Sequence, residues 1–117
     1  MNTIQNYTFE VNEKQELIID PYHKRKYVLN SGRAEAFAEA FQEVMEADHE
    51  VVIREFEDDD EREHVIKKIK SRKGFTLTID GNVFTEEEAR GIARFIDKEY
   101  PQVTDPEAWK DFWRSYK

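Results

Sequence analysis

The chain has 117 residues, a formal net charge of −8 and no cysteine, which excludes disulfides, thiol nucleophiles and cysteine-bound metals. Charged residues and hydrophobic residues each make up 38% of the chain, so the hydrophobic core must be small. The eight Phe, five Tyr and two Trp nevertheless supply enough apolar volume to argue against intrinsic disorder. We expect one domain over residues 1–117 in the cytoplasm, outside any membrane, because no apolar run suits a signal peptide or a membrane span.

The first thirty residues predict a three-stranded antiparallel meander. Apolar residues alternate with polar ones over 7–11, and further apolar runs cover 17–19 and 27–29. The polar segment 12–15 indicates a turn between the first two strands. Asp20-Pro21 ends the second strand, since proline lacks a donor for the strand ladder.

The next segment predicts an amphipathic helix over 33–47, capped by Asn30 or Ser31. Apolar residues recur there at spacings of three and four, and glutamates line the opposite side. A strand over 51–56 follows, indicated by its β-branched residues.

The segment 58–73 is interpreted as a lightly packed surface helix. Its acidic start and basic end match the two ends of a helix dipole. Gly74 is the expected terminator.

Residues 75–100 predict a strand, a tight turn, a short return strand and a capped helix. Alternation over 75–79 indicates a half-buried strand, and Asp80-Gly81 favours a type I′ hairpin turn. Thr85 and Glu88 form a capping box for a helix over 86–100. A second capping box at Thr104 predicts a terminal helix with an aromatic face.

These elements predict an α+β fold in a single small domain. The N-terminal meander, the central strand and the 75–79 hairpin form an antiparallel sheet, with three to four helices packed on it.

The acidic residues are the first candidate functional group. Between Glu35 and Glu63 thirteen carboxylates accompany two arginines, a local charge of −11. Carboxylates one helical turn apart lie about 6 Å from each other, comparable to phosphates along a nucleic-acid strand. We therefore expect a non-catalytic inhibitor or adaptor that presents an acidic surface, a nucleic-acid mimic, to a basic protein partner that itself handles nucleic acid. The candidate contacts are Glu35, Glu39, Glu43, Glu46, Asp58, Asp59, Asp60 and Glu61. In composition and size the chain is similar to small acidic inhibitors from phages and mobile elements, including anti-restriction and anti-CRISPR proteins.

Two alternatives remain open. The basic clusters at 23–26 and 67–73 could form a nucleic-acid-binding module, with phosphate contacts from Lys24, Arg25, Lys26, Lys67, Lys68, Lys70, Arg72 and Lys73. The terminal aromatic residues Trp109, Phe112, Trp113 and Tyr116 could instead form the seam of a homo-oligomeric structural protein, so that the chain would be a homodimer rather than a monomer.

Catalysis has little support in the sequence. His23, His49 and His64 are scattered without metal-ligand spacing, and no phosphate-binding loop or nucleophile elbow occurs. We therefore expect no catalytic residue, no metal site and no cofactor.

Overall fold

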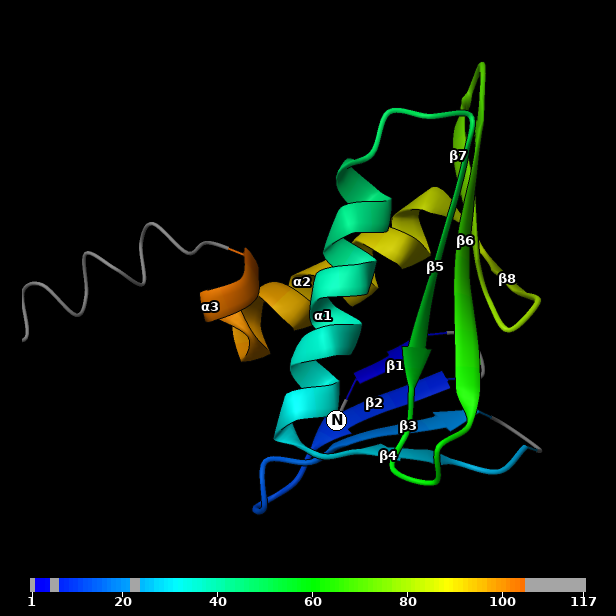
Figure 1. The fold of residues 1–117 in the computed structure, drawn as a ribbon. Coiled ribbons are helices and arrows are strands. Elements are labelled where there is room, and N and C mark those ends of the chain that lie inside the picture. The colour runs from blue at the N-terminus through cyan, green and yellow to red at the C-terminus, as the bar shows by residue number, and fades with distance from the viewer. Residues whose placement is uncertain (1, 5–6, 22–23, 105–117) are drawn as a thin grey trace, which may run out of the picture.

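The computed structural model describes residues 2–4, 7–21 and 24–104 and has the predicted α+β fold. Two four-stranded antiparallel sheets, of order β1-β2-β3-β4 and β5-β6-β7-β8, meet at an angle, with the helices on their inner side (Figure 1). The strands are β1 (Asn2–Ile4), β2 (Tyr7–Val11), β3 (Leu17–Pro21), β4 (Tyr27–Leu29), β5 (Val51–Glu57), β6 (Glu63–Ser71), β7 (Gly74–Ile79) and β8 (Asn82–Phe84). The helices are α1 (Ser31–Glu46), α2 (Glu86–Glu99) and α3 (Pro101–Thr104).

The first sheet contains the predicted meander, extended by β1. Alternate residues of β2 and β3 point into the core, so that Phe9 stands opposite Ile19 and both are fully buried. The strands predicted at 51–56 and 75–79 lie in a separate sheet. In the sequence, α1 separates the four strands of the first sheet from the four strands of the second. The two sheets contact each other where the backbone N–H of Asp59, in the β5–β6 turn, donates to the backbone carbonyl of Val28 in β4 at 2.8 Å.

The predicted helix over 58–73 is wrong, because residues 63–71 form strand β6. His64, Ile66 and Lys68 point inward and are buried, while Glu63, Val65, Lys67 and Ile69 point to the other face. The period is therefore two, but a histidine and a lysine occupy inward positions and hide the apolar alternation. Gly74 does not end a helix but begins β7.

The local signals around both long helices are confirmed. Asn30 caps α1 by accepting the Arg33 N–H, and Thr85 and Glu88 form the complete capping box of α2. Asp80 and Gly81 have φ values of 51° and 83°, the positive pair that a type I′ turn requires.

The core lies between the helices and the two sheets. α1 packs on β5 and β6, whereas α2 packs on β7, β8 and β1 (Figure 1). Phe37 and Phe41 of α1 and Ile92 and Ile96 of α2 supply much of the buried apolar surface. The predicted terminal helix and its aromatic face fall on residues 105–117, outside the described residues.

Candidate functional site

The four predicted glutamates of α1 form one exposed stripe. Glu35, Glu39, Glu43 and Glu46 all lie on the side of the helix away from its buried residues. Their neighbours hold some of them in place, since Gln102 Nε2 donates to Glu35 at 3.2 Å and Arg54 Nε to Glu43 at 2.8 Å. The stripe runs most of the length of α1, so its negative charge faces solvent over several helical turns.

The remaining predicted carboxylates lie in the turn between β5 and β6, not at a helix start. Asp60 and Glu61 are exposed and Asp59 is partly exposed. Asp58 is 0% exposed, so the prediction that it contacts a partner is wrong. Its Oδ1 instead accepts the backbone N–H groups of Asp60 and Arg62 at 2.9 and 3.0 Å, which shapes the turn.

Two arginines link α1 to the turn and to β5. Arg33 in the first turn of α1 contacts Glu57 at 3.3 Å and Asp59 at 3.4 Å. Arg54 of β5 pairs with Glu43 across the helix–strand contact. The acidic turn therefore lies beside the N-terminal end of α1, the end at which the glutamate stripe begins. We call the exposed carboxylates of the stripe and the turn the acidic surface: Glu35, Glu39, Glu43, Glu46, Asp59, Asp60 and Glu61.

The arginines around the acidic surface neutralise only part of its charge. Arg25 pairs with Asp60 at 2.7 Å, but both side chains are more than half exposed. Exposed ion pairs of this kind contribute about 0–1 kcal/mol because water screens them. Carboxylates outnumber these arginines, so the surface stays negative.

The two basic clusters do not form one patch among the described residues. Lys24, Arg25 and Lys26 lie next to the start of β6, where the Arg62 guanidinium donates to Lys26 O at 3.0 Å. Arg72 and Lys73 lie at the far end of β6, roughly 30 Å away at the usual rise of a strand. His23 lies outside the described residues.

Lys68, one of the predicted phosphate contacts, is buried. Its Nζ donates to Ala47 O at 2.6 Å and to Met45 O at 3.2 Å, so it satisfies carbonyls at the C-terminal end of α1. Burial, with repulsion from Lys70, lowers the pKa of Lys68 below the ordinary lysine value. Lys67 points to the opposite face of the sheet. The cluster at 67–73 is therefore divided between the core and the surface.

A buried polar cluster, which the sequence analysis missed, joins the two sheets. His64 Nε2 lies 2.9 Å from Asp58 Oδ2, and His64 Nδ1 lies 2.7 Å from Asp80 Oδ2. Both contacts are hydrogen bonds at once only when both ring nitrogens carry a proton. The ring stacks on Tyr27 at 3.8 Å and on Phe56 at 5.1 Å between ring centroids.

The surrounding donors keep both aspartates of this cluster ionised. Burial raises the pKa of the Asp58 carboxyl, but His64, the backbone of the turn and the Arg62 guanidinium outweigh burial, so the pKa lies below the ordinary aspartate value. The pKa of Asp80 is also lowered, since donation from Tyr27, the Val65 N–H and His64 outweighs burial. The same burial and the Asp80 carboxylate raise the pKa of Tyr27.

The polar cluster contains residue types that are common in catalytic sites, but a substrate cannot reach its imidazole. His64 is 5% exposed and Asp58 is fully buried, so a substrate would have to displace the aromatic rings to reach the imidazole. Carboxylates already contact both ring nitrogens, and the described residues contain no group of three or more His, Asp or Glu side chains that could hold a metal ion. The arrangement is suited to holding the two sheets together.

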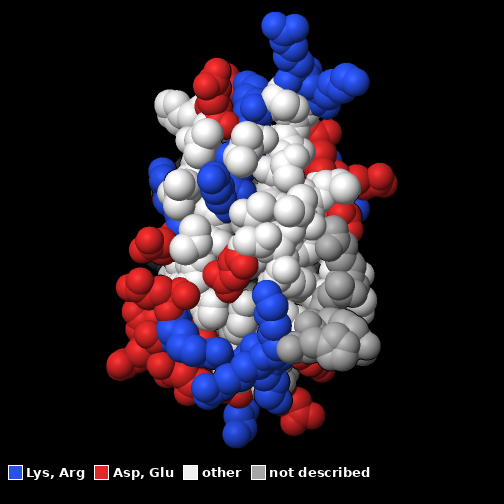
Figure 2. All heavy atoms as spheres, turned by 90° about the vertical axis from the view of Figure 1, so that its right-hand side faces the viewer, with Lys and Arg blue, Asp and Glu red and all other residues white. Residues whose placement is uncertain are grey.

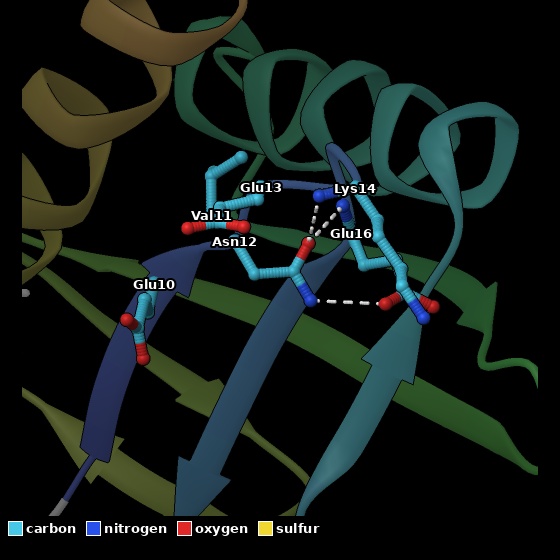
Figure 3. Close-up of a pocket in the computed structure, with 6 residues that line it drawn as sticks. All are labelled: Glu10, Val11, Asn12, Glu13, Lys14 and Glu16. Carbon is cyan, nitrogen blue, oxygen red and sulfur yellow. Dashed lines mark hydrogen bonds between the residues drawn. The ribbon is translucent and has the colours of Figure 1, made fainter.

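A hollow of about 480 Å³ lies beside the β2–β3 turn (Figure 3). Five of its six lining residues are polar or charged, and the Asn12 side chain makes its hydrogen bonds within the turn. The Asn12 Oδ1 accepts the N–H groups of Lys14 and Glu16 at 3.0 Å, and its Nδ2 donates to the Glu16 carboxylate at 2.9 Å. The polar groups in this hollow stabilise the turn and do not converge on a bound molecule.

No protein family, curated protein or solved structure matches this chain. Within the described residues, no helix is long and apolar enough to cross a membrane.

Proposed function

We propose that this chain is a non-catalytic inhibitor or adaptor that binds a basic site on another protein, in particular a protein that handles nucleic acid. The single observation that carries the proposal is the acidic surface, in which exposed glutamates follow α1 and Arg33 holds the acidic β5–β6 turn beside the first turn of the same helix. Asp58 is excluded from the contact set because it is buried.

The spacing of the carboxylates supports mimicry of a phosphate backbone. Glu35, Glu39 and Glu43 are one helical turn apart, about 6 Å along the axis. A groove lined with lysine and arginine to hold a nucleic-acid strand would meet a similar series of negative charges on this helix. The protein would then occupy the groove and exclude the nucleic acid.

The arginines within the acidic surface limit how tightly a basic partner could bind. Arg33 and Arg54 already pair with Glu57, Asp59 and Glu43, so a partner's cations must displace them or use the remaining carboxylates. Because such pairing is mostly electrostatic, binding should weaken steeply as salt is added.

The test is affinity capture on the immobilised protein, with washes of increasing salt up to about 0.5 M, where the screening length falls below roughly 5 Å. The probes are a lysine- and arginine-rich peptide and extracts that contain nucleic-acid-binding proteins, each with and without competing DNA. We expect bound proteins to elute with salt and to be displaced by DNA.

Charge-reversal variants locate the binding surface. The double variant Glu39→Lys with Glu43→Lys should abolish capture. The matched control Glu13→Lys with Asp97→Lys makes the same change in net charge at two exposed carboxylates outside the acidic surface, and it should retain most of the binding. Binding that survives high salt and tolerates the first double variant would refute the proposal.

A further inference from the structure

No helix or strand among the described residues covers the outer face of the β5–β8 sheet, which carries several exposed apolar side chains. Four large apolar side chains are exposed among the described residues, and all four lie on this face: Val51 at 51%, Ile53 at 49%, Ile69 at 43% and Val83 at 56%. The helices α1 and α2 cover the opposite face of the sheet (Figure 1). In Figure 2, uncharged side chains make up most of the middle of this face, with a few charged side chains among them.

The apolar residues are in register across the strands. Val51 stands opposite Ile69, and the next row joins Ile53 and Val83 through Lys67 and Thr78. Solvent-facing positions of an antiparallel sheet are normally polar. Exposed apolar side chains gathered across several strands are more typical of an interaction surface.

Charged side chains of opposite sign lie at the two ends of this face. Glu55, Glu57 and Glu63 point outward at the end near the β5–β6 turn, whereas Arg72 and Lys73 are exposed in the β6–β7 turn. In Figure 2, Lys and Arg project at the upper end of the face beside a smaller group of Asp and Glu, and Asp and Glu gather at the lower left. The lower end also carries Lys and Arg, in keeping with the Arg25–Asp60 pair, so the charge difference between the ends is modest.

We propose that this face binds the same face of a second copy of the chain, with the strands of the two copies antiparallel across the interface. A twofold axis perpendicular to the strands places the glutamates of each copy over the Arg72–Lys73 end of the other. The parallel arrangement would bring like charges together at both ends. Twofold interfaces of this kind are the commonest among homo-oligomers, because the patch need only complement itself.

The size of the face sets the strength of the association. Four strands about 4.8 Å apart and about seven residues long give a flat area of roughly 400 Å² per copy. A stable complex buries about 800 Å² per partner, so the dimer should be weak, with a dissociation constant in the micromolar range or above. α1 lies on the covered side of the sheet, so its glutamate stripe remains exposed in the dimer.

The experiment is analytical ultracentrifugation of the full chain at low salt, from about 5 to 500 μM, the range in which so small an interface associates. We expect a monomer–dimer equilibrium that weakens with salt. Ile53→Lys and Ile69→Lys should each give a monomer throughout, with circular dichroism unchanged, because both side chains are already half-exposed.

Charge exchange tests the antiparallel arrangement. Glu55→Lys with Glu63→Lys makes both ends of the face basic, and Arg72→Glu with Lys73→Glu makes both ends acidic. Each protein alone should lose self-association, and an equimolar mixture should recover it. Glu13→Lys with Asp97→Lys, away from the face, is the control that should dimerise like the wild type.

Three results would overturn the proposal. The first is a wild-type chain that stays monomeric over the whole concentration range. The second is a dimer unaffected by Ile53→Lys and Ile69→Lys, which would place the contact on another surface, such as the terminal aromatic residues. The third is a mixture of the two charge variants that remains monomeric.

Discussion

Replacing His64 by alanine should destabilise the protein strongly, because the imidazole lies between the buried carboxylate of Asp58 and the partly exposed carboxylate of Asp80. The variant removes contacts of 2.9 Å to Asp58 and 2.7 Å to Asp80, along with stacking on two aromatic rings. Hydrogen bonds to charged groups contribute about 1.5–3 kcal/mol each, and removing one partner of a buried ion pair costs about 3–5 kcal/mol.

The remaining donors moderate that cost. Asp58 keeps two backbone N–H groups and the Arg62 contact at 3.0 Å, and Asp80 keeps Tyr27 and the Val65 N–H. We therefore expect a loss of about 3–4 kcal/mol in the free energy of unfolding, or roughly 12–16 °C in melting temperature for a domain of this size.

The assay is urea unfolding followed by circular dichroism, with His49→Ala as the matched control. His49 is exposed in the loop before β5, so its replacement should change stability by no more than about 0.5 kcal/mol. If His64→Ala costs no more than His49→Ala, the polar cluster does not hold the sheets together and the reasoning fails.

The polar cluster also predicts how stability depends on pH. The folded pKa values of Asp58 and Asp80 lie below the ordinary value of about 3.9. The two ionised aspartates therefore contribute their full share of the free energy of unfolding above that value, and this contribution is lost as the pH falls through the folded pKa values. In His64→Ala, where each carboxylate has lost a donor, stability should fall less steeply in acid.

Three further substitutions test other parts of the structure by the same unfolding measurement. Gly81→Ala should cost about 1–2 kcal/mol from its φ of 83° alone, since a Cβ there meets no atom within 4 Å; no loss would contradict the type I′ turn. Lys68→Met should cost about 1–3 kcal/mol by leaving helix-end carbonyls without a donor. Because the folded pKa of Lys68 is lowered, the wild type should also gain stability relative to the variant as pH rises toward about 10.4. Tyr100→Phe should be neutral or stabilising, since the buried hydroxyl has no hydrogen-bond partner among the described residues; a loss above about 1 kcal/mol would indicate a partner elsewhere in the chain.

Local signals in the sequence predicted much of the fold. The Thr85 capping box, the Asp80-Gly81 turn and the apolar stripe of α1 each depend on residues within a few positions of one another. Such patterns are independent of the rest of the molecule. The glutamate stripe was predictable for the same reason, because helical periodicity alone places it opposite the buried side.

Strand β6 was not predictable in the same way, because its inward polar residues find their partners far away in the sequence. His64 pairs with Asp80 sixteen residues later, and Lys68 reaches carbonyls more than twenty residues earlier. Without those partners, the charges at the two ends of 58–73 favour a helix. The burial of Asp58 follows from the same contacts, so the sequence could not separate it from its exposed neighbours.

The polar cluster also determines how β6 aligns with its neighbours. A slip of one residue would turn His64 outward and present Val65 to the two aspartates. The buried Asp58 carboxylate would then lose its contact with the imidazole, at a cost of several kcal/mol. An apolar residue at position 64 would penalise the slip far less, because Val65 and Ile66 could exchange faces with little change in hydrophobicity. The ionic contacts thus exclude competing alignments of a strand whose apolar residues alone would permit two.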